Sequence, residues 1–135
     1  MIALDSSFLI GYYNERDSQH AAARDLMDDF LGGKWGPGLL LEYVLLEVVT
    51  VLLMRRNLEV ASRVGRLLLT ARELEFVPCS DVFLQALQTF EGQAGTRLSF
   101  TDAALAVIAR TRAEGRILTF DAEFAKFPGL HPQPE

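Results

Sequence analysis

The sequence predicts an α/β fold, a three-layer α/β/α sandwich around a short, mostly parallel central sheet. Short apolar runs alternate along the chain with longer segments whose apolar residues recur at helical spacing. This alternation is typical of parallel sheets that carry helices on both faces. The length of 135 residues fits one domain over residues 1–135, and no repeat or low-complexity tract divides it.

The elements expected in the first half follow from apolar spacing and from breaker residues. The apolar run at 2–4 stops at Asp5, as a buried strand does, and residues 32–38 are rich in glycine. We expect a strand at 2–4, helices at 7–13 and 18–31, a short strand around Trp35, and helices at 40–56 and 59–71.

The second half alternates in the same way. Pro78 should end a strand, Ser80 and Asp81 offer an N-cap for the next helix, and Gly115 should end the last long helix. We expect a strand at 75–78, a helix from this cap to about 91, a helix at 100–113, a strand at 116–120, and at most a short strand in the tail 128–135.

Composition limits the class of protein. The single cysteine, Cys79, excludes an internal disulfide and a cysteine-rich zinc site, and it suits a reducing cytoplasm. The opening residues, MIALDSSFL, have no positively charged leader, so we expect no signal peptide. The most apolar window, residues 39–54, contains two glutamates and is shorter than the roughly 20 apolar residues of a membrane span. We therefore expect a soluble cytoplasmic protein.

The net charge of −5 argues against nucleic-acid binding by simple electrostatic attraction, which needs lysine and arginine at the phosphates. A nuclease is still possible, because carboxylates gathered for metal form a local negative site that cations neutralise. Five arginines fall within one central segment, and they form either a basic face or scattered surface charges. They are Arg55, Arg56, Arg63, Arg66 and Arg72.

Two aspartates follow expected strands. Asp5 comes directly after the first strand and Asp121 after the strand at 116–120. Both should lie at the carboxyl edge of the sheet, where ligands bind in such folds. Each also has an ordinary explanation, since an aspartate in this position can cap the helix that follows.

Glu47 lies within the long helix expected at 40–56. Its neighbours one turn away are mostly apolar, so we expect a carboxylate that is costly to bury alone. Such a group needs a partner, either a metal ion or an arginine. Glu42, at the start of the same helix, is better explained by its favourable interaction with the helix dipole.

Asp102 follows Ser99 by three residues, at the start of the helix expected at 100–113. That spacing resembles a capping box, so a capping role and a functional role are both supported. Three alanines shortly after Asp102 permit close approach of backbone or substrate. Ser7, two residues after Asp5, can orient a carboxylate or hold a metal-bound water.

Four segments together resemble the signature blocks of PIN-domain ribonucleases, in the family's order and separation. The length is typical of the VapC-type toxins of toxin–antitoxin pairs, and the resemblance covers nearly the whole chain. The segments are residues 2–7, 43–48, 98–103 and 117–121.

The resemblance implies a role for each matching residue. Asp5, Glu47 and Asp102 would hold the metal, Asp121 would complete the site, and Ser7 would be the small polar residue of the first block. Two further positions match less directly. His20 resembles a structural position of the family, and Leu46 stands where many relatives have a polar residue.

The resemblance further implies a metal-dependent endoribonuclease that cuts single-stranded or looped RNA. Mg²⁺ or Mn²⁺ suits all-oxygen ligands and can activate water for attack on a phosphodiester. Phe8, Phe100 and Phe120 either stack on bases or pack in the core. The family also implies a homodimer and a small antitoxin, for which the apolar helices around residues 40–71 offer a surface.

Other functions fit less well. His20 and His131 lie outside the four blocks, which disfavours a two-histidine ribonuclease, and no phosphate loop, zinc-protease motif or serine-nucleophile motif is present. A receiver-type signalling domain should have paired acids after its first strand and a lysine at a late strand end, but Lys126 does not follow a strand. A catalytically silent PIN domain that only binds a partner is the other alternative.

Overall fold

The computed structural model describes residues 1–135 and contains one five-stranded sheet. The strand order is β3-β2-β1-β4-β5, and every neighbouring pair is parallel. The predicted α/β class is therefore confirmed. The strands are β1 (Ile2–Leu4), β2 (Gly38–Leu41), β3 (Leu74–Val77), β4 (Arg116–Leu118) and β5 (His131–Gln133).

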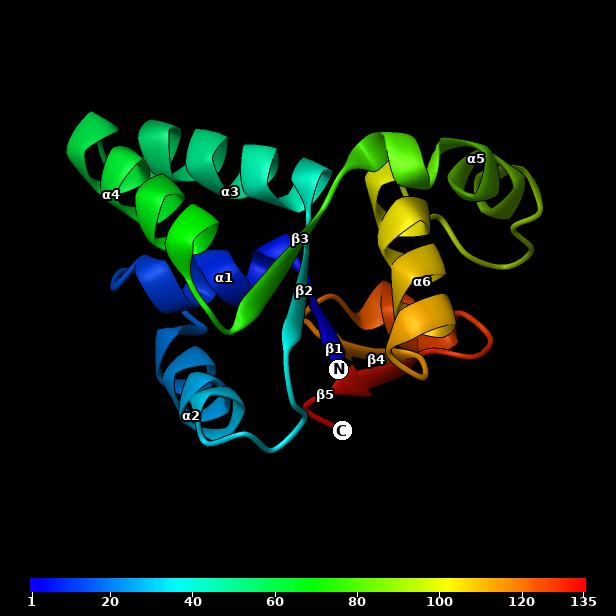
Figure 1. The fold of residues 1–135 in the computed structure, drawn as a ribbon, viewed down its shortest axis with the longest axis horizontal. Coiled ribbons are helices and arrows are strands. Elements are labelled where there is room, and N and C mark those ends of the chain that lie inside the picture. The colour runs from blue at the N-terminus through cyan, green and yellow to red at the C-terminus, as the bar shows by residue number, and fades with distance from the viewer.

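Helices lie on both faces of this sheet and give three layers. Figure 1 shows α1 to α4 on one side of the strands and α5 and α6 on the other.

No helix has the length and apolar character needed to cross a membrane. The helices are α1 (Ser6–Tyr13), α2 (His20–Leu31), α3 (Glu42–Arg55), α4 (Leu58–Thr70), α5 (Phe83–Glu91) and α6 (Phe100–Arg112), with 3₁₀ turns η1 (Cys79–Asp81) and η2 (Ala122–Lys126).

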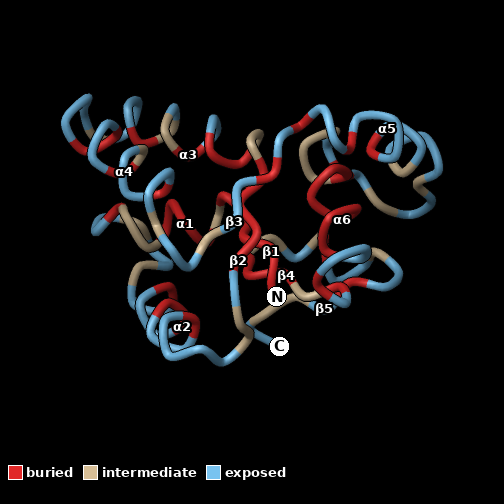
Figure 2. The backbone as a smooth tube through the Cα atoms, viewed as in Figure 1, coloured by how far each residue is buried: buried red, intermediate tan, exposed pale blue.

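The core follows the central strands and the helices that face them. All residues of β1 and β2 are buried, because both faces of these strands are covered (Figure 2). In α6 the whole run from Ala103 to Ala109 is buried. The alanines noted in the sequence therefore serve close packing of this helix against the sheet and α5.

The chain reverses its direction of travel across the sheet between β1 and β4. It runs outward from β1 to β2 and β3, and then returns to place β4 on the other side of β1. Leu4 pairs with Leu118, and the N–H of Asp5 donates to the carbonyl of Leu118 at 3.0 Å. The residues after these two strands are thus neighbours at the edge where α/β folds bind ligands.

The strand expected around Trp35 is wrong. Gly33 and Gly36 have φ angles of 88° and 79°, and a hydrogen bond from Gly36 N–H to Gly33 carbonyl closes a turn there. The strand starts instead at Gly38, where a side-chain Cβ would lie only 2.8 Å from Leu74 Cδ2. Because β2 extends to Leu41, α3 begins at Glu42 and not at residue 40.

Two other boundaries also differ from expectation. Ser80 and Asp81 do not cap a helix; they form η1, and α5 begins after Val82 without a side-chain cap. The N–H of Val82 donates to the carbonyl of Cys79, which closes the tight turn. The strand expected at 116–120 is shorter and ends at Leu118. The N–H of Phe120 donates to the side-chain hydroxyl of Ser7 and not to a neighbouring strand.

Candidate active site

A cleft of about 650 Å³ opens at the carboxyl edge of the sheet. Its walls come from α1, the loop before α2, α3, the start of α6 and the loop after β4. The four acids singled out in the sequence all line it, and so does Ser7. These residues are Asp5, Ser7, Glu47, Asp102 and Asp121.

Asp5 is the most buried of the four acids, at 4% exposure. Ser7 Oγ donates to its Oδ2 at 2.7 Å, and Thr119 Oγ1 donates to the same oxygen at 2.6 Å. Asp5 occupies the N-cap position of α1, but its side chain makes no capping hydrogen bond. The capping explanation therefore fails for Asp5.

The two hydroxyls join the ends of β1 and β4. Ser7 Oγ accepts from the N–H of Phe120, and Thr119 Oγ1 accepts from the N–H of Asp121, both at 2.9 Å. Sequence reasoning missed Thr119, which is 4% exposed and contacts Asp5 directly. The available signal was the position of Thr119, a hydroxyl residue two residues before Asp121 within the strand expected at 116–120.

Asp121 combines both roles that the sequence left open. Its Oδ1 accepts from the N–H of Glu123 at 2.9 Å, so it caps η2. The same side chain also lines the cleft. A capping bond therefore leaves its second oxygen, Oδ2, for other partners.

Asp102 projects from the first turn of α6. Ser99 Oγ accepts from the N–H of Asp102 at 3.1 Å, so the predicted N-cap is present. The pKa of the Asp102 carboxyl is raised to about 6, chiefly by burial and also by the charge of Asp5, while hydrogen bonds with Ser99 oppose the shift. Burial also raises the pKa of Asp5, against the two hydroxyl hydrogen bonds.

Glu47 lies in the cleft wall, but the reason given for it from sequence is wrong. The side chain is exposed, because the buried face of α3 is formed by Val44, Val48 and Leu52, and Glu47 lies beside that face. None of the ion pairs in the structure involves Glu47, so no arginine neutralises it. By contrast, Glu42 accepts from the N–H of Cys79 at 2.9 Å and ties α3 to η1.

The donor set fits Mg²⁺ or Mn²⁺. All four acids offer oxygen ligands, and an open cleft allows the retained waters that these ions prefer. Both hydroxyl bonds fall on Oδ2 of Asp5 and neither uses Oδ1. The acids are distributed around the cleft. No three acidic, histidine or cysteine side chains lie close enough together to enclose an ion.

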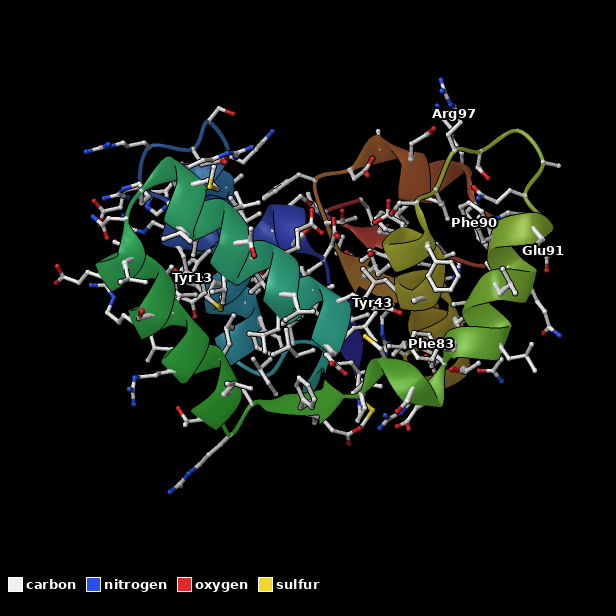
Figure 3. All side chains as sticks on the ribbon, turned by 90° about the horizontal axis from the view of Figure 1, so that it is seen from above. Tyr13, Tyr43, Phe83, Phe90, Glu91 and Arg97 are labelled. Atoms are coloured by element: carbon white, nitrogen blue, oxygen red, sulfur yellow. The ribbon has the colours of Figure 1, made fainter.

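The aromatic candidates separate by position. Phe8 is fully buried in the core, whereas Phe120 is half-buried and lines the cleft. Phe100 packs against Tyr43 and Phe90, with ring centroids 6.3 and 6.0 Å away. Figure 3 shows Tyr43 and Phe90 beside the start of α6, so Phe100 joins α3, α5 and α6.

The remaining polar candidates, apart from Arg55, lie outside the cleft. His20 Nδ1 is 2.9 Å from the carbonyl oxygen of Gly11, which links α2 to α1 and agrees with a structural role. Lys126 pairs with Glu123 at 3.0 Å on η2. Of the five central arginines only Arg55 lines the cleft, so a continuous basic face does not border the acids.

Comparison with known proteins decides the family. A model of the PIN domain matches residues 2–130. The chain belongs to the PIN-domain family. No curated protein sequence matches the chain.

Two solved structures of VapC proteins share this PIN fold. One is VapC20 of Mycobacterium tuberculosis, described as a sarcin–ricin loop cleaving toxin, with a TM-score of 0.84 and 21% identity over 96% of this chain and 97% of that one. The other is VapBC2 of Rickettsia felis bound to a DNA fragment from its promoter, with a TM-score of 0.63 and 18% identity over 98% of each chain. At these identities the likeness concerns the fold.

Proposed function

We propose that this PIN domain is a metal-dependent endoribonuclease and the toxin of a type II toxin–antitoxin pair. One observation carries the proposal. Four acids from four separate segments line a single cleft at the switch point of the sheet, and they lie in the four segments that resemble the signature blocks of PIN-domain ribonucleases. Enzymes of this family are typically Mg²⁺-dependent nucleases.

In this proposal the carboxylates hold the cation and the hydroxyls hold the carboxylates. Asp5, Glu47, Asp102 and Asp121 are the metal ligands, and Ser7 and Thr119 orient Asp5 through Oδ2. When bound, Mg²⁺ or Mn²⁺ supplies Lewis acidity at the phosphodiester and a positive charge that offsets the repulsion among the acids. The raised pKa values of Asp5 and Asp102 reflect burial and that repulsion.

The substrate in this proposal is single-stranded or looped RNA. An unstacked base can lie on an aromatic face, and Phe120 is the aromatic residue of the cleft. The VapC20 toxin, which is similar in fold, is described as cleaving an RNA loop.

The partners in this proposal are a small antitoxin and a second copy of the chain, in the cytoplasm. A groove of about 340 Å³ between α1, α2 and α4 is lined mostly by apolar residues, and leucines are exposed on α3 and α4. VapBC2, of similar fold, is a toxin–antitoxin pair. Light scattering of the purified chain should give twice the monomer mass; a monomer at micromolar concentration would contradict the homodimer.

The test is cleavage of labelled, structured RNA by the purified chain, free of any partner, in Mn²⁺, in Mg²⁺ and in EDTA. We expect cleavage with either metal, and loss of cleavage in EDTA and in Asp5→Asn. The variant Asp25→Asn on the exposed side of α2 is the matched control and should cleave normally.

If the wild type and Asp5→Asn behave alike, the cleavage comes from a contaminant and the nuclease proposal fails. The catalytically silent binding module then becomes the leading alternative. A receiver-type domain is disfavoured because Lys126 does not line the cleft that holds the four acids and instead pairs with Glu123 on η2.

A further inference from the structure

Arg55 is the one cationic side chain in the wall of the cleft. The other charged residues that line it are five acids: Asp5, Asp17, Glu47, Asp102 and Asp121. The Arg55 side chain is 60% exposed, so its guanidinium faces solvent and not the core. A polyanion that enters this cleft therefore meets a single guanidinium among carboxylates.

Helix α3 places Arg55 on the same side as Glu47. Glu47, Val51 and Arg55 follow one another at intervals of four residues, and all three line the cleft. Eight residues of α-helix span about 12 Å. The arginine and the glutamate thus line the cleft about 12 Å apart along the helix.

Asp17 is the ion-pair partner of Arg55, and the contact between them is long. Asp17 Oδ1 accepts from the N–H of Gln19 at 2.8 Å, just before α2, and Oδ2 lies 4.0 Å from Arg55 Nη1. A pair this far apart, with its arginine exposed to solvent, contributes little to stability. Its long separation leaves the N–H donors of Arg55 available to another acceptor.

Neighbouring arginines are engaged or directed elsewhere. Arg56 Nη1 donates to Asn14 Oδ1 at 3.3 Å, which joins the end of α3 to the end of α1. Arg97, in the loop before α6, extends away from the protein in Figure 3 and does not line the cleft. Arg55 is therefore the only arginine that lines the cleft.

We propose that Arg55 binds a backbone phosphate of the RNA, a neighbour of the phosphate that lies at the four acids. The inference rests on the proposed nuclease function. The planar guanidinium matches the oxygens of a phosphate with two parallel hydrogen bonds. Arg55 is a substrate-binding residue in this account, so its loss weakens binding more than it slows the chemical step.

The first test is the kinetics of Arg55→Ala and Arg55→Lys on a labelled single-stranded RNA in Mn²⁺. We expect Arg55→Ala to raise KM about tenfold, the loss of one charge-assisted contact, with kcat nearly unchanged. Arg55→Lys should recover part of the affinity, because it keeps the charge but not the planar donors. Arg63→Ala, an exposed arginine of α4 outside the cleft, is the matched control and should behave as wild type.

The second test is RNA binding in an Asp102→Asn background, measured by fluorescence anisotropy over a range of salt concentrations. Adding Arg55→Ala should weaken binding and reduce the slope of log K against log salt by about 0.7, the value for one phosphate of a single strand. This test separates the two proposals. If the wild type never cleaves but Arg55→Ala still lowers affinity and slope, the phosphate site stands and the nuclease fails. If the wild type cleaves and Arg55→Ala leaves KM, affinity and slope unchanged, the inference is overturned; absence of any RNA binding also overturns it.

Discussion

Asp5 depends on two hydroxyl groups, one from the first turn of α1 and one from the residue after β4. Ser7 and Thr119 both donate to its Oδ2, and Thr119 is buried with it. Partners of this kind orient a metal ligand, and their loss typically lowers metal affinity by about 10- to 100-fold. Thr119 is a positioning residue in this account.

Thr119→Val should therefore weaken Mn²⁺ binding by about 10- to 100-fold, while Thr119→Ser, which keeps the hydroxyl, should bind nearly as wild type. Valine also leaves the N–H of Asp121 without its acceptor, at a cost of about 1–3 kcal/mol in unfolding free energy. Calorimetric titration and urea denaturation measure the two effects. Equal Mn²⁺ affinity in Thr119→Val and Thr119→Ser would contradict the positioning role.

Asp102 makes the stability of the metal-free protein depend on pH. Its folded pKa of about 6 lies above the ordinary value of 3.8, so between these values the folded chain holds a proton that the unfolded chain has released. The contribution of Asp102 to stability therefore falls as pH rises from about 4 to about 6.

Asp102→Asn removes this contribution, so its stability relative to wild type should increase with pH across that window. Urea denaturation in EDTA at pH 4.5, 5.5, 6.5 and 7.5 measures the difference, with the exposed Asp25→Asn as control. A difference between Asp102→Asn and wild type that stays constant with pH would show that Asp102 titrates normally.

Glu47 shows how far a single helix pattern predicts a site. Its apolar neighbours on the helix singled it out, but the prediction that Glu47 is buried was wrong. Glu47 lies on the side of α3 that forms the wall of the cleft, next to the side that packs in the core. Periodicity predicts on which face of its helix a residue lies, but it does not predict what packs against that face. The neighbours of Glu47 depend on tertiary packing, which spacing does not contain.

At the scale of elements, α4 begins with an N-cap that is independent of the site. Asn57 Oδ1 accepts from the N–H of Val60 at 2.8 Å, and α4 then packs against α3, which carries Glu47. Asn57→Ala should lower the free energy of unfolding by about 1 kcal/mol, and Asn57→Asp should retain it.

Urea denaturation of these Asn57 variants is the measurement, and the m-value should not change. Equal stability of the alanine and aspartate variants would mean that the cap contributes nothing to α4.

Element boundaries were predictable where a local signal decides them. The apolar run that stops at Asp5 marked β1, and the Ser99 cap marked the start of α6. The β2 strand was misplaced because its start depends on pairing with Ile2 and Leu74, which are distant in sequence. Ser80 and Asp81 were misread because the same residue types favour a tight turn as readily as a cap.

At the scale of the whole molecule, the parallel order of the strands makes the site. Asp5 and Asp121 are separated by most of the chain, yet β1 and β4 are paired and their ends are neighbours. The class of fold and the edge of the sheet were predictable from alternation and from acids after strands. The convergence of Glu47 and Asp102 on the same cleft was expected only from the PIN resemblance. The spacing of residues along the sequence does not predict how far apart two separate helices lie.

We propose that these four acids together bind a divalent cation. Isothermal titration of the partner-free chain with Mn²⁺ at pH 7.5 tests it most directly, beside Glu47→Gln, Asp102→Asn and the control Glu59→Gln on α4. We predict that the wild type and the control bind Mn²⁺ alike and that each site variant binds at least about tenfold more weakly. No Mn²⁺ binding by the wild type, or equal binding by all four proteins, would contradict the account.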